Sequence, residues 1–185
     1  MTVSLVKEVH RRLAEVIGQG DLCLDATAGN GFDTLFLAQR AGDTGTVHAM
    51  DVQKDALRST ERLLEQSDVR DRVTTHLTCH SKMETVLPGN AKGRIRAITF
   101  NLGYLPKGDK SITTRKETTL PAVRNAYDWL AENGVISVLC YRGHSGGKAE
   151  EAGIRELIET CNWKSEIITG NDSGESPVLH WIEKP

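Results

Sequence analysis

This sequence has no apolar run approaching the ~20 residues that a membrane-spanning helix needs. Its N-terminal stretch, MTVSLVKEVHRRL, carries charges where a secretory signal peptide has an apolar core. Its cysteines form no CxxC pair and lie far apart, at Cys23, Cys79, Cys140 and Cys161, so neither a zinc site nor a disulfide scaffold is predicted. No cluster of histidine, cysteine and acidic residues has metal-ligand spacing, so we expect no bound metal. Together these absences predict a reduced, cytoplasmic protein that is not attached to a membrane.

Internal repeats, low-complexity segments and long linkers are also missing, which predicts that residues 1–185 form a single domain. The apolar fraction of 38% and the charged fraction of 26% are ordinary for a globular protein and exclude a disordered or fibrous chain. The formal net charge is −2, so the overall charge gives no reason to expect a nucleic-acid partner.

Two hydrophobic periods alternate along the chain. Apolar residues recur at helical spacing in the stretches 3–18, 35–38, 56–64, 120–130 and 154–158. Short apolar runs typical of strands occupy 22–24, 46–50, 73–79, 95–100, 135–140, 165–169 and 178–182. This alternation predicts an α/β fold of the doubly wound, Rossmann-like class, with a mostly parallel sheet and helices on both faces. Because no helical pattern separates the last two strands, we expect an antiparallel C-terminal strand to close the sheet.

A glycine-containing loop, Asp-Ala-Thr-Ala-Gly-Asn-Gly-Phe-Asp-Thr over residues 25–34, follows the first predicted strand. Gly29 and Gly31 allow a tight turn close to a ligand, and the next helix points its N-terminal amides at that ligand. Asp51 ends the second predicted strand, where a carboxylate can accept both hydroxyls of a ribose. The pattern predicts a nucleotide-containing cofactor. The expected contacts are Asp25, Thr27, Gly29, Asn30, Gly31, Asp33, Thr34 and Asp51.

Two positions in the loop distinguish between cofactors. Thr34 occupies the place of the third glycine of the dinucleotide motif G-x-G-x-x-G. Asp25 directly precedes the loop, where a carboxylate would repel the pyrophosphate of a dinucleotide but would suit a cation or an ammonium group. S-adenosylmethionine carries both a sulfonium and an α-ammonium, so we expect it to be the cofactor.

Three motifs make the sequence resemble a known family. They are the loop at 25–34, Asn-Leu-Gly-Tyr-Leu-Pro-Lys-Gly-Asp-Lys at 101–110, and Tyr-Arg-Gly-His-Ser-Gly-Gly at 141–147 with Glu150. The chain resembles the class I S-adenosylmethionine-dependent methyltransferases, and among these the small bacterial rRNA methylase family, which includes tRNA 5-(aminomethyl)-2-thiouridine methyltransferases. The resemblance implies a seven-stranded sheet, a homodimer, and methylation of the aminomethyl nitrogen of a wobble uridine. The implied partner is the anticodon stem-loop of a tRNA.

The second motif follows the fourth predicted strand and holds the candidates for the chemistry. In amino-methyltransferases an Asn/Asp-Pro-Pro-Tyr turn in this place holds the target nitrogen, and here Leu-Gly replaces Pro-Pro. Asn101 and Tyr104 are the expected catalytic counterparts, and a plain strand-to-helix turn with a packing tyrosine is the alternative. An alkylammonium must lose a proton before it can attack. Asp109 is the predicted acceptor, and a salt bridge to Lys107 or Lys110 is its alternative role.

The stretch 104–124 holds five basic and two acidic residues, a local excess of +3. This excess predicts phosphate contacts by Lys107, Lys110 and Arg115, although such a charge run is also typical of a solvated loop. In the third motif, Tyr141 and His144 are expected to stack on the target base or to bond its edge. A helix-start residue near Glu150 is the alternative for His144.

Further cofactor contacts are expected from loops after the other strands. Gln53 and the pair His80–Ser81 lie where adenine is usually met in this topology. The family carries a histidine at the place of His10, close to the cofactor. The alternative is a half-buried histidine whose hydrogen bonds are made within the protein. The remaining predicted contacts are Asn101 and Gly103.

Alternative functions remain open at this point. Methylation of ribosomal RNA or of another amine belongs to the same class of enzyme. A nicotinamide-dependent oxidoreductase is disfavoured by Thr34 and by the absence of a separate catalytic domain. A non-catalytic RNA-binding module is disfavoured because the loop, Asp51 and the polar motifs are all intact.

Overall fold

The computed structural model describes residues 4–170 and 176–185 of the chain. A seven-stranded sheet runs through these residues in the order β3-β2-β1-β4-β5-β7-β6. The strands are β1 (Leu22–Asp25), β2 (Thr46–Asp51), β3 (Val73–Leu77), β4 (Ile95–Leu102), β5 (Leu130–Cys140), β6 (Lys164–Thr169) and β7 (Val178–Glu183). All neighbouring pairs from β3 to β5 are parallel, whereas β7 runs antiparallel to β5 and β6. The predicted fold class and its antiparallel closing pair are confirmed.

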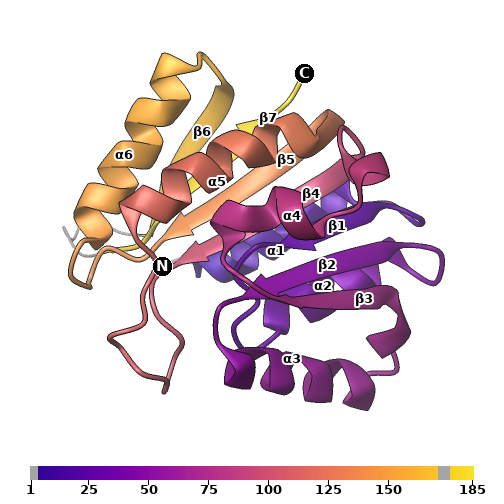
Figure 1. Ribbon diagram of the computed structural model, residues 1–185. Coiled ribbons are helices and arrows are strands. Elements are labelled where there is room, and N and C mark those ends of the chain that lie inside the picture. The colour runs from indigo at the N-terminus through magenta and orange to yellow at the C-terminus, as the bar shows by residue number, and fades with distance from the viewer. Residues whose placement is uncertain (1–3, 171–175) are drawn as a thin grey trace.

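Helices cover both faces of the sheet (Figure 1). The α-helices are α1 (Leu5–Val16), α2 (Phe32–Ala41), α3 (Lys54–Gln66), α4 (Met83–Val86), α5 (Lys116–Trp129) and α6 (Gly147–Thr160). Three single 3₁₀ turns are η1 (Arg70–Arg72), η2 (His80–Lys82) and η3 (Gly89–Ala91). Apolar residues of α1, α2 and α3 form one buried cluster with one face of the sheet, and those of α4, α5 and α6 form a second cluster with the other face. The sheet is therefore the middle of three layers.

Element ends differ from the expected ones where polar residues begin a helix. The helix expected at 120–130 begins four residues earlier, at Lys116, and the helix expected at 154–158 begins seven residues earlier, at Gly147. Apolar spacing marks only the turns that face the core, so it does not reveal a polar first turn. The strand expected at 73–79 ends at Leu77, because the chain then turns into η2.

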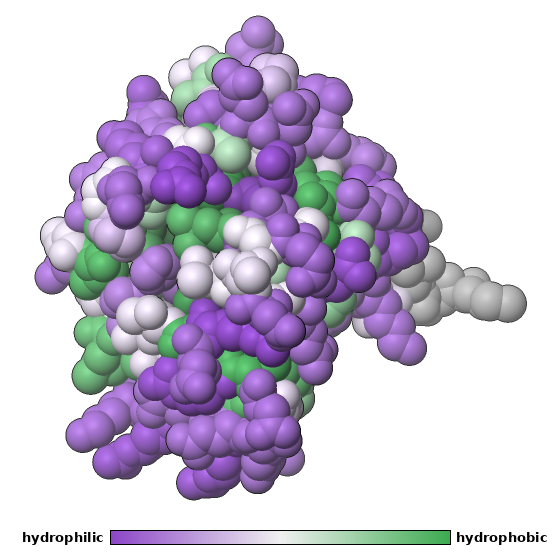
Figure 2. All heavy atoms as spheres, turned by 90° about the vertical axis from the view of Figure 1, so that its right-hand side faces the viewer, coloured by the Kyte–Doolittle hydropathy of each residue, from purple (hydrophilic) through white to green (hydrophobic). Residues whose placement is uncertain are grey.

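The strand order reverses between β1 and β4: β2 and β3 are added on one side of β1, and β4 and β5 are added on the other. In open α/β sheets this reversal opens a crevice at the carboxyl ends of the strands, which is the usual place for a ligand. Figure 2 shows the face of the molecule that lies opposite the loop after β4. This face is mostly hydrophilic and has only small, separate hydrophobic patches. No helix in the described part of the chain is long and apolar enough to cross a membrane.

Candidate active site

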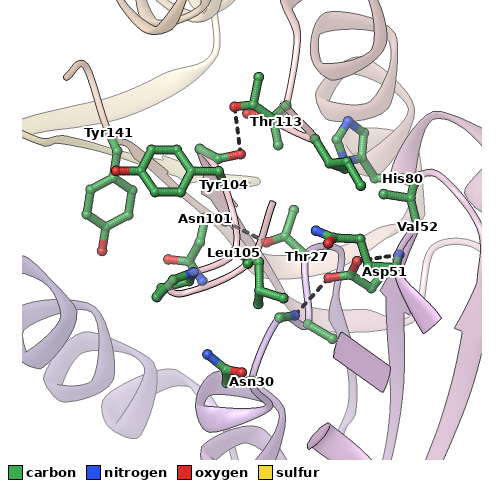
Figure 3. A pocket seen from close by; sticks show the side chains of 18 of the residues that line it. Thr27, Asn30, Asp51, Val52, His80, Asn101, Tyr104, Leu105, Thr113 and Tyr141 are labelled. Atoms are coloured by element: carbon green, nitrogen blue, oxygen red, sulfur yellow. Dashed lines mark hydrogen bonds between the residues drawn. The ribbon is translucent and has the colours of Figure 1, made fainter. Parts of the chain in front are cut away.

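A cavity of about 1440 Å³ opens at the carboxyl ends of β1, β2, β4 and β5 (Figure 3). Fourteen of the predicted site residues line it: Thr27, Gly29, Asn30, Asp33, Asp51, Gln53, His80, Asn101, Gly103, Tyr104, Lys107, Asp109, Tyr141 and His144. Six others do not reach its wall: Asp25, Gly31, Thr34, Ser81, Lys110 and Arg115. One cavity thus joins the glycine loop, the end of β2 and the second and third motifs.

The glycine loop has the conformation that only glycine adopts at low cost. Gly31 has a φ of +85°, and a Cβ there would lie 2.8 Å from the Cα of Thr60 on α3. Gly29 has a φ of +53°, and a Cβ there would meet only the Leu105 side chain, at 3.5 Å. The Thr60 hydroxyl donates a hydrogen bond to the carbonyl of Gly29 (3.1 Å). Gly31 therefore sets the contact between the loop and α3, while Gly29 faces the cavity.

Asp25 lies behind the loop. It is fully buried and accepts hydrogen bonds from the Thr34 hydroxyl (2.6 Å) and from the Thr27 amide (3.2 Å). Burial, together with the nearby carboxylate of Asp33, raises the pKa of Asp25 to about 7. In this arrangement Asp25 and Thr34 hold the loop in shape from behind the cavity wall, and the raised pKa leaves Asp25 only partly ionised at pH 7.

Asp51 presents its carboxylate at the end of β2. Its Oδ2 accepts a hydrogen bond from the amide of Gly29 (2.9 Å), and its Oδ1 accepts one from the amide of Gln53 (2.8 Å). Burial raises the pKa of this half-buried carboxyl, against the effect of the two amides. Both oxygens keep a lone pair for a ligand, which suits a pair of ribose hydroxyls.

His80 closes the cavity beyond Asp51. It is buried, and burial lowers its pKa to about 4, so its imidazole is neutral at pH 7. Its Nε2 lies 3.4 Å from the hydroxyl of Thr119 on α5. The hydroxyl of Ser81 turns to the sulfur of Cys79 (3.2 Å) and not to the cavity wall. A neutral imidazole suits an uncharged heterocycle better than a phosphate.

Asn101 lies at the centre of the cavity wall, on β4. Its backbone amide donates to the hydroxyl of Thr27 (2.7 Å), and its Nδ2 donates to Oδ2 of Asp33 (2.6 Å). Asp33 is buried, and its Oδ1 contacts Nε2 of His10 (2.6 Å). His10 is thus half-buried and bonded, and it reaches the cavity through Asp33.

Three rings gather at one side of the cavity. Tyr104 and Tyr141 are 40% and 41% exposed, which leaves ring surface open to a ligand. Tyr104 meets the ring of His144 edge-on, with centroids 6.3 Å apart, and the ammonium of Lys110 lies 5.4 Å from the Tyr104 centroid. Burial and the nearby Asp33 carboxylate raise the pKa of Tyr141, so it stays a neutral phenol at pH 7. Figure 3 shows both tyrosines beside Asn101.

The loop after β4 is joined at its base and extends away from the sheet (Figure 1). The carbonyl of Gly103 accepts hydrogen bonds from the Thr113 hydroxyl and from the Thr114 amide, both at 2.9 Å. Asp109 near the tip is exposed and accepts a hydrogen bond from the amide of Ser111 (2.8 Å), which lowers its pKa. The alternative expected for Asp109 does not occur: among the described residues no salt bridge joins it to a lysine.

Sequence reasoning missed several side chains of the site. Phe32, in the first turn of α2, lines the cavity and is 67% exposed, and Val52 and Ile112 line it at 52% and 41% exposure. Their signal was weak because an isolated apolar residue in a loop is common on any surface. Glu150 stands out in the sequence only as part of a motif, yet its carboxyl is buried. It accepts hydrogen bonds from the hydroxyls of Thr114 (2.9 Å) and Thr119 (2.5 Å), so it ties the loop base to α5 and α6.

Candidate metal ligands do not cluster: the described residues contain no group of three or more histidine, cysteine or acidic side chains that could hold a metal ion.

The sequence and the fold match known proteins. The family model described as "Putative rRNA methylase" matches residues 47–177. The chain is 46% identical over 176 residues to the chloroplastic tRNA (mnm(5)s(2)U34)-methyltransferase of Arabidopsis thaliana, covering 91% of this chain and 58% of that protein. It therefore spans little more than half the length of that relative.

Solved structures agree with the family match. A protein of Clostridium thermocellum described as a "putative rRNA-methylase" has a TM-score of 0.91 and 33% identity over the whole of both chains. SMU.1697c of Streptococcus mutans, described as a "putative methyltransferase" in complex with SAH, has a TM-score of 0.87 and 28% identity over the whole of both chains. The expected resemblance is confirmed: this chain belongs to the rRNA methylase family and has the fold of the class I S-adenosylmethionine-dependent methyltransferases.

Proposed function

We propose that this chain is an S-adenosylmethionine-dependent methyltransferase that acts on the aminomethyl nitrogen of 5-aminomethyl-(2-thio)uridine at the wobble position of tRNA. The observation that carries the proposal is the single cavity in which the nucleotide-binding elements and the motif of Asn101 and Tyr104 face one another. The name of the Arabidopsis relative supports the substrate, and the SAH in the Streptococcus structure supports the cofactor.

The residues present fit the cofactor. Asp51 offers two carboxylate oxygens for the ribose hydroxyls, and the exposed side chain of Val52 with neutral His80 offers a surface for adenine. Asp33, whose carboxylate lines the cavity, provides the negative charge that a cationic methionine moiety needs. When bound, S-adenosylmethionine would supply a methyl group that an amine lone pair can attack, forming an N–C bond while the C–S bond breaks and SAH leaves as a neutral thioether.

The chain's own residues have to hold the amine and remove its proton. An alkylammonium has a pKa near the ~10.4 of lysine, so deprotonation is a necessary step at neutral pH. We propose that Asn101 and Tyr104 hold the nitrogen and that Asp109 accepts the proton. The pKa of Asp109 is lowered, so it keeps a proton only briefly, and its exposed position lets the proton pass on to solvent.

RNA binding is proposed for the rim of the cavity. Lys107 lines the cavity and Lys110 lies against Tyr104, which places two cations beside the aromatic rings. Arg115, exposed at the start of α5, extends this basic rim. Phosphate contacts from these residues would position the strand while Tyr141 and His144 stack on the splayed base. The homodimer that the family resemblance implies and the cytoplasmic location expected from the composition remain part of the proposal.

Two experiments test the function. Calorimetry of the purified chain should show binding of SAH and no binding of NAD, and Asp51→Ala should weaken the SAH affinity by about tenfold or more because a charge-assisted hydrogen bond is lost. Nucleoside mass spectrometry of tRNA from a deletion strain should show accumulation of unmethylated aminomethyl-uridine. The family description favours ribosomal RNA as the second candidate substrate. Unchanged tRNA nucleosides together with a lost methylated nucleoside in ribosomal RNA would establish that candidate instead.

A further inference from the structure

A buried carboxylate links the first helix of the chain to the centre of the cavity. Asp33 in the first turn of α2 is 8% exposed and contacts two partners, His10 on α1 and Asn101 on β4, each at 2.6 Å. No lysine or arginine among the described residues forms an ion pair with it. Its two oxygens are therefore used to hold two particular side chains.

The carboxylate decides which way the Asn101 amide faces. A carboxylate oxygen only accepts hydrogen bonds, so the 2.6 Å contact must be made by the NH₂ group of Asn101. The opposite orientation would place two oxygens 2.6 Å apart, which is repulsive. With the NH₂ group held by Asp33, the amide oxygen Oδ1 is turned to the other side, and no hydrogen-bond donor among the described residues reaches it.

We propose that Asp33 is a positioning residue, and that it fixes Asn101 so that Oδ1 accepts a hydrogen bond from the amine to be methylated. This inference rests on the proposed function. An amine that attacks a methyl group must point its lone pair at that methyl, so its hydrogens must point at acceptors. An Asn101 amide turned the other way would offer two donors in the same place and would compete for the lone pair.

His10 has a matching role toward Asp33. Its Nε2 must carry the hydrogen that Oδ1 of Asp33 accepts, and its ring stacks on Phe36 with a centroid distance of 4.0 Å and an interplanar angle of 7°. The stacking holds the imidazole, and the imidazole holds one oxygen of Asp33. The contacts from α1 through α2 to β4 thus fix the orientation of the Asn101 side-chain amide.

Exchanging donor and acceptor tests the inference. Asn101→Asp faces Asp33 with a second carboxylate and should lower kcat by about 100-fold, the scale of a misplaced reacting group. The double variant Asp33→Asn/Asn101→Asp restores the hydrogen bond with the roles exchanged, and it leaves one oxygen of residue 101 as an acceptor in the cavity. Its kcat should return to within about tenfold of the wild type, the scale of one hydrogen bond. Asp33→Ala should lose activity like Asn101→Asp.

Three further measurements separate this role from others. SAH affinity by calorimetry and urea unfolding show whether a variant has lost its cofactor site or its fold, and Asp43→Asn, at an exposed ion pair outside the cavity, is the matched control that should keep wild-type kcat. A double variant no more active than Asn101→Asp, with SAH binding and stability intact, would refute the inference. So would wild-type kcat in Asp33→Ala. A wild type that leaves aminomethyl-uridine tRNA unmethylated would instead refute the proposed function.

Discussion

Replacing either glycine of the cofactor loop by alanine separates backbone strain from steric contact. Both Gly29 and Gly31 have positive φ, so each alanine pays the left-handed backbone cost of ~1–2 kcal/mol. At Gly29 the new Cβ meets a flexible leucine side chain at an ordinary distance of 3.5 Å. At Gly31 it meets the Cα of Thr60 at 2.8 Å, which forces α3 to move and adds ~1–3 kcal/mol.

We therefore expect Gly29→Ala to lower the free energy of unfolding by ~1–2 kcal/mol and Gly31→Ala by ~2–5 kcal/mol. Urea unfolding of the two variants beside the wild type measures both values under the same conditions. The same displacement of α3 should weaken SAH binding, which calorimetry measures. Equal losses of stability in the two variants would show that the contact with Thr60 does not determine the loop, and the reasoning would be wrong.

Three other predictions concern the proton acceptor, the binding of the RNA and the pH dependence of stability. Asp109→Asn should reduce kcat with SAH affinity nearly unchanged, and a large loss of SAH binding would remove its assignment as proton acceptor. Tyr141→Ala should weaken binding of an anticodon stem-loop by ~1–3 kcal/mol, the value of one stacked base, in a fluorescence anisotropy titration. The control Leu77→Ala, exposed at the end of β3 outside the cavity, should bind normally, and equal losses would exclude a specific platform. The pKa of Asp25 is raised to about 7, so its contribution to stability is complete below pH ~4 and is lost as the pH rises through 7. Asp25→Asn should abolish this part of the pH dependence in urea unfolding, and an unchanged profile would contradict the burial of the charge.

The local part of the site could be predicted from the sequence. Asp51 and the two glycines belong to a strand-loop-helix pattern whose residues are close in the chain, so their meeting follows from the pattern alone. The ends of β4 and β5 follow from the parallel sheet, which brings Asn101 and Tyr141 to the same edge. These predictions needed only the order of the elements.

The direction in which side chains point could not be predicted. Asp25 and Asp33 are eight positions apart in one loop, yet Asp25 is behind the loop and Asp33 lines the cavity. Their positions depend on the turn at Gly31 and on the packing of α3, which the spacing of residues does not specify. The partnership of Glu150 with Thr114 spans 36 residues, and no periodic pattern predicts it.

The position of β7 between β5 and β6 has a consequence for the order of folding during synthesis. In the described part of the sheet, β6 pairs only with β7, and β7 is the later of the two to leave the ribosome. Strands β2, β3, β4 and β5 can each pair as soon as they are made, because each has a neighbour that precedes it in the chain. β6 must wait, unpaired, until the final strand inserts beside β5. The part of the sheet that carries the cavity can therefore form before β6 and β7 join it.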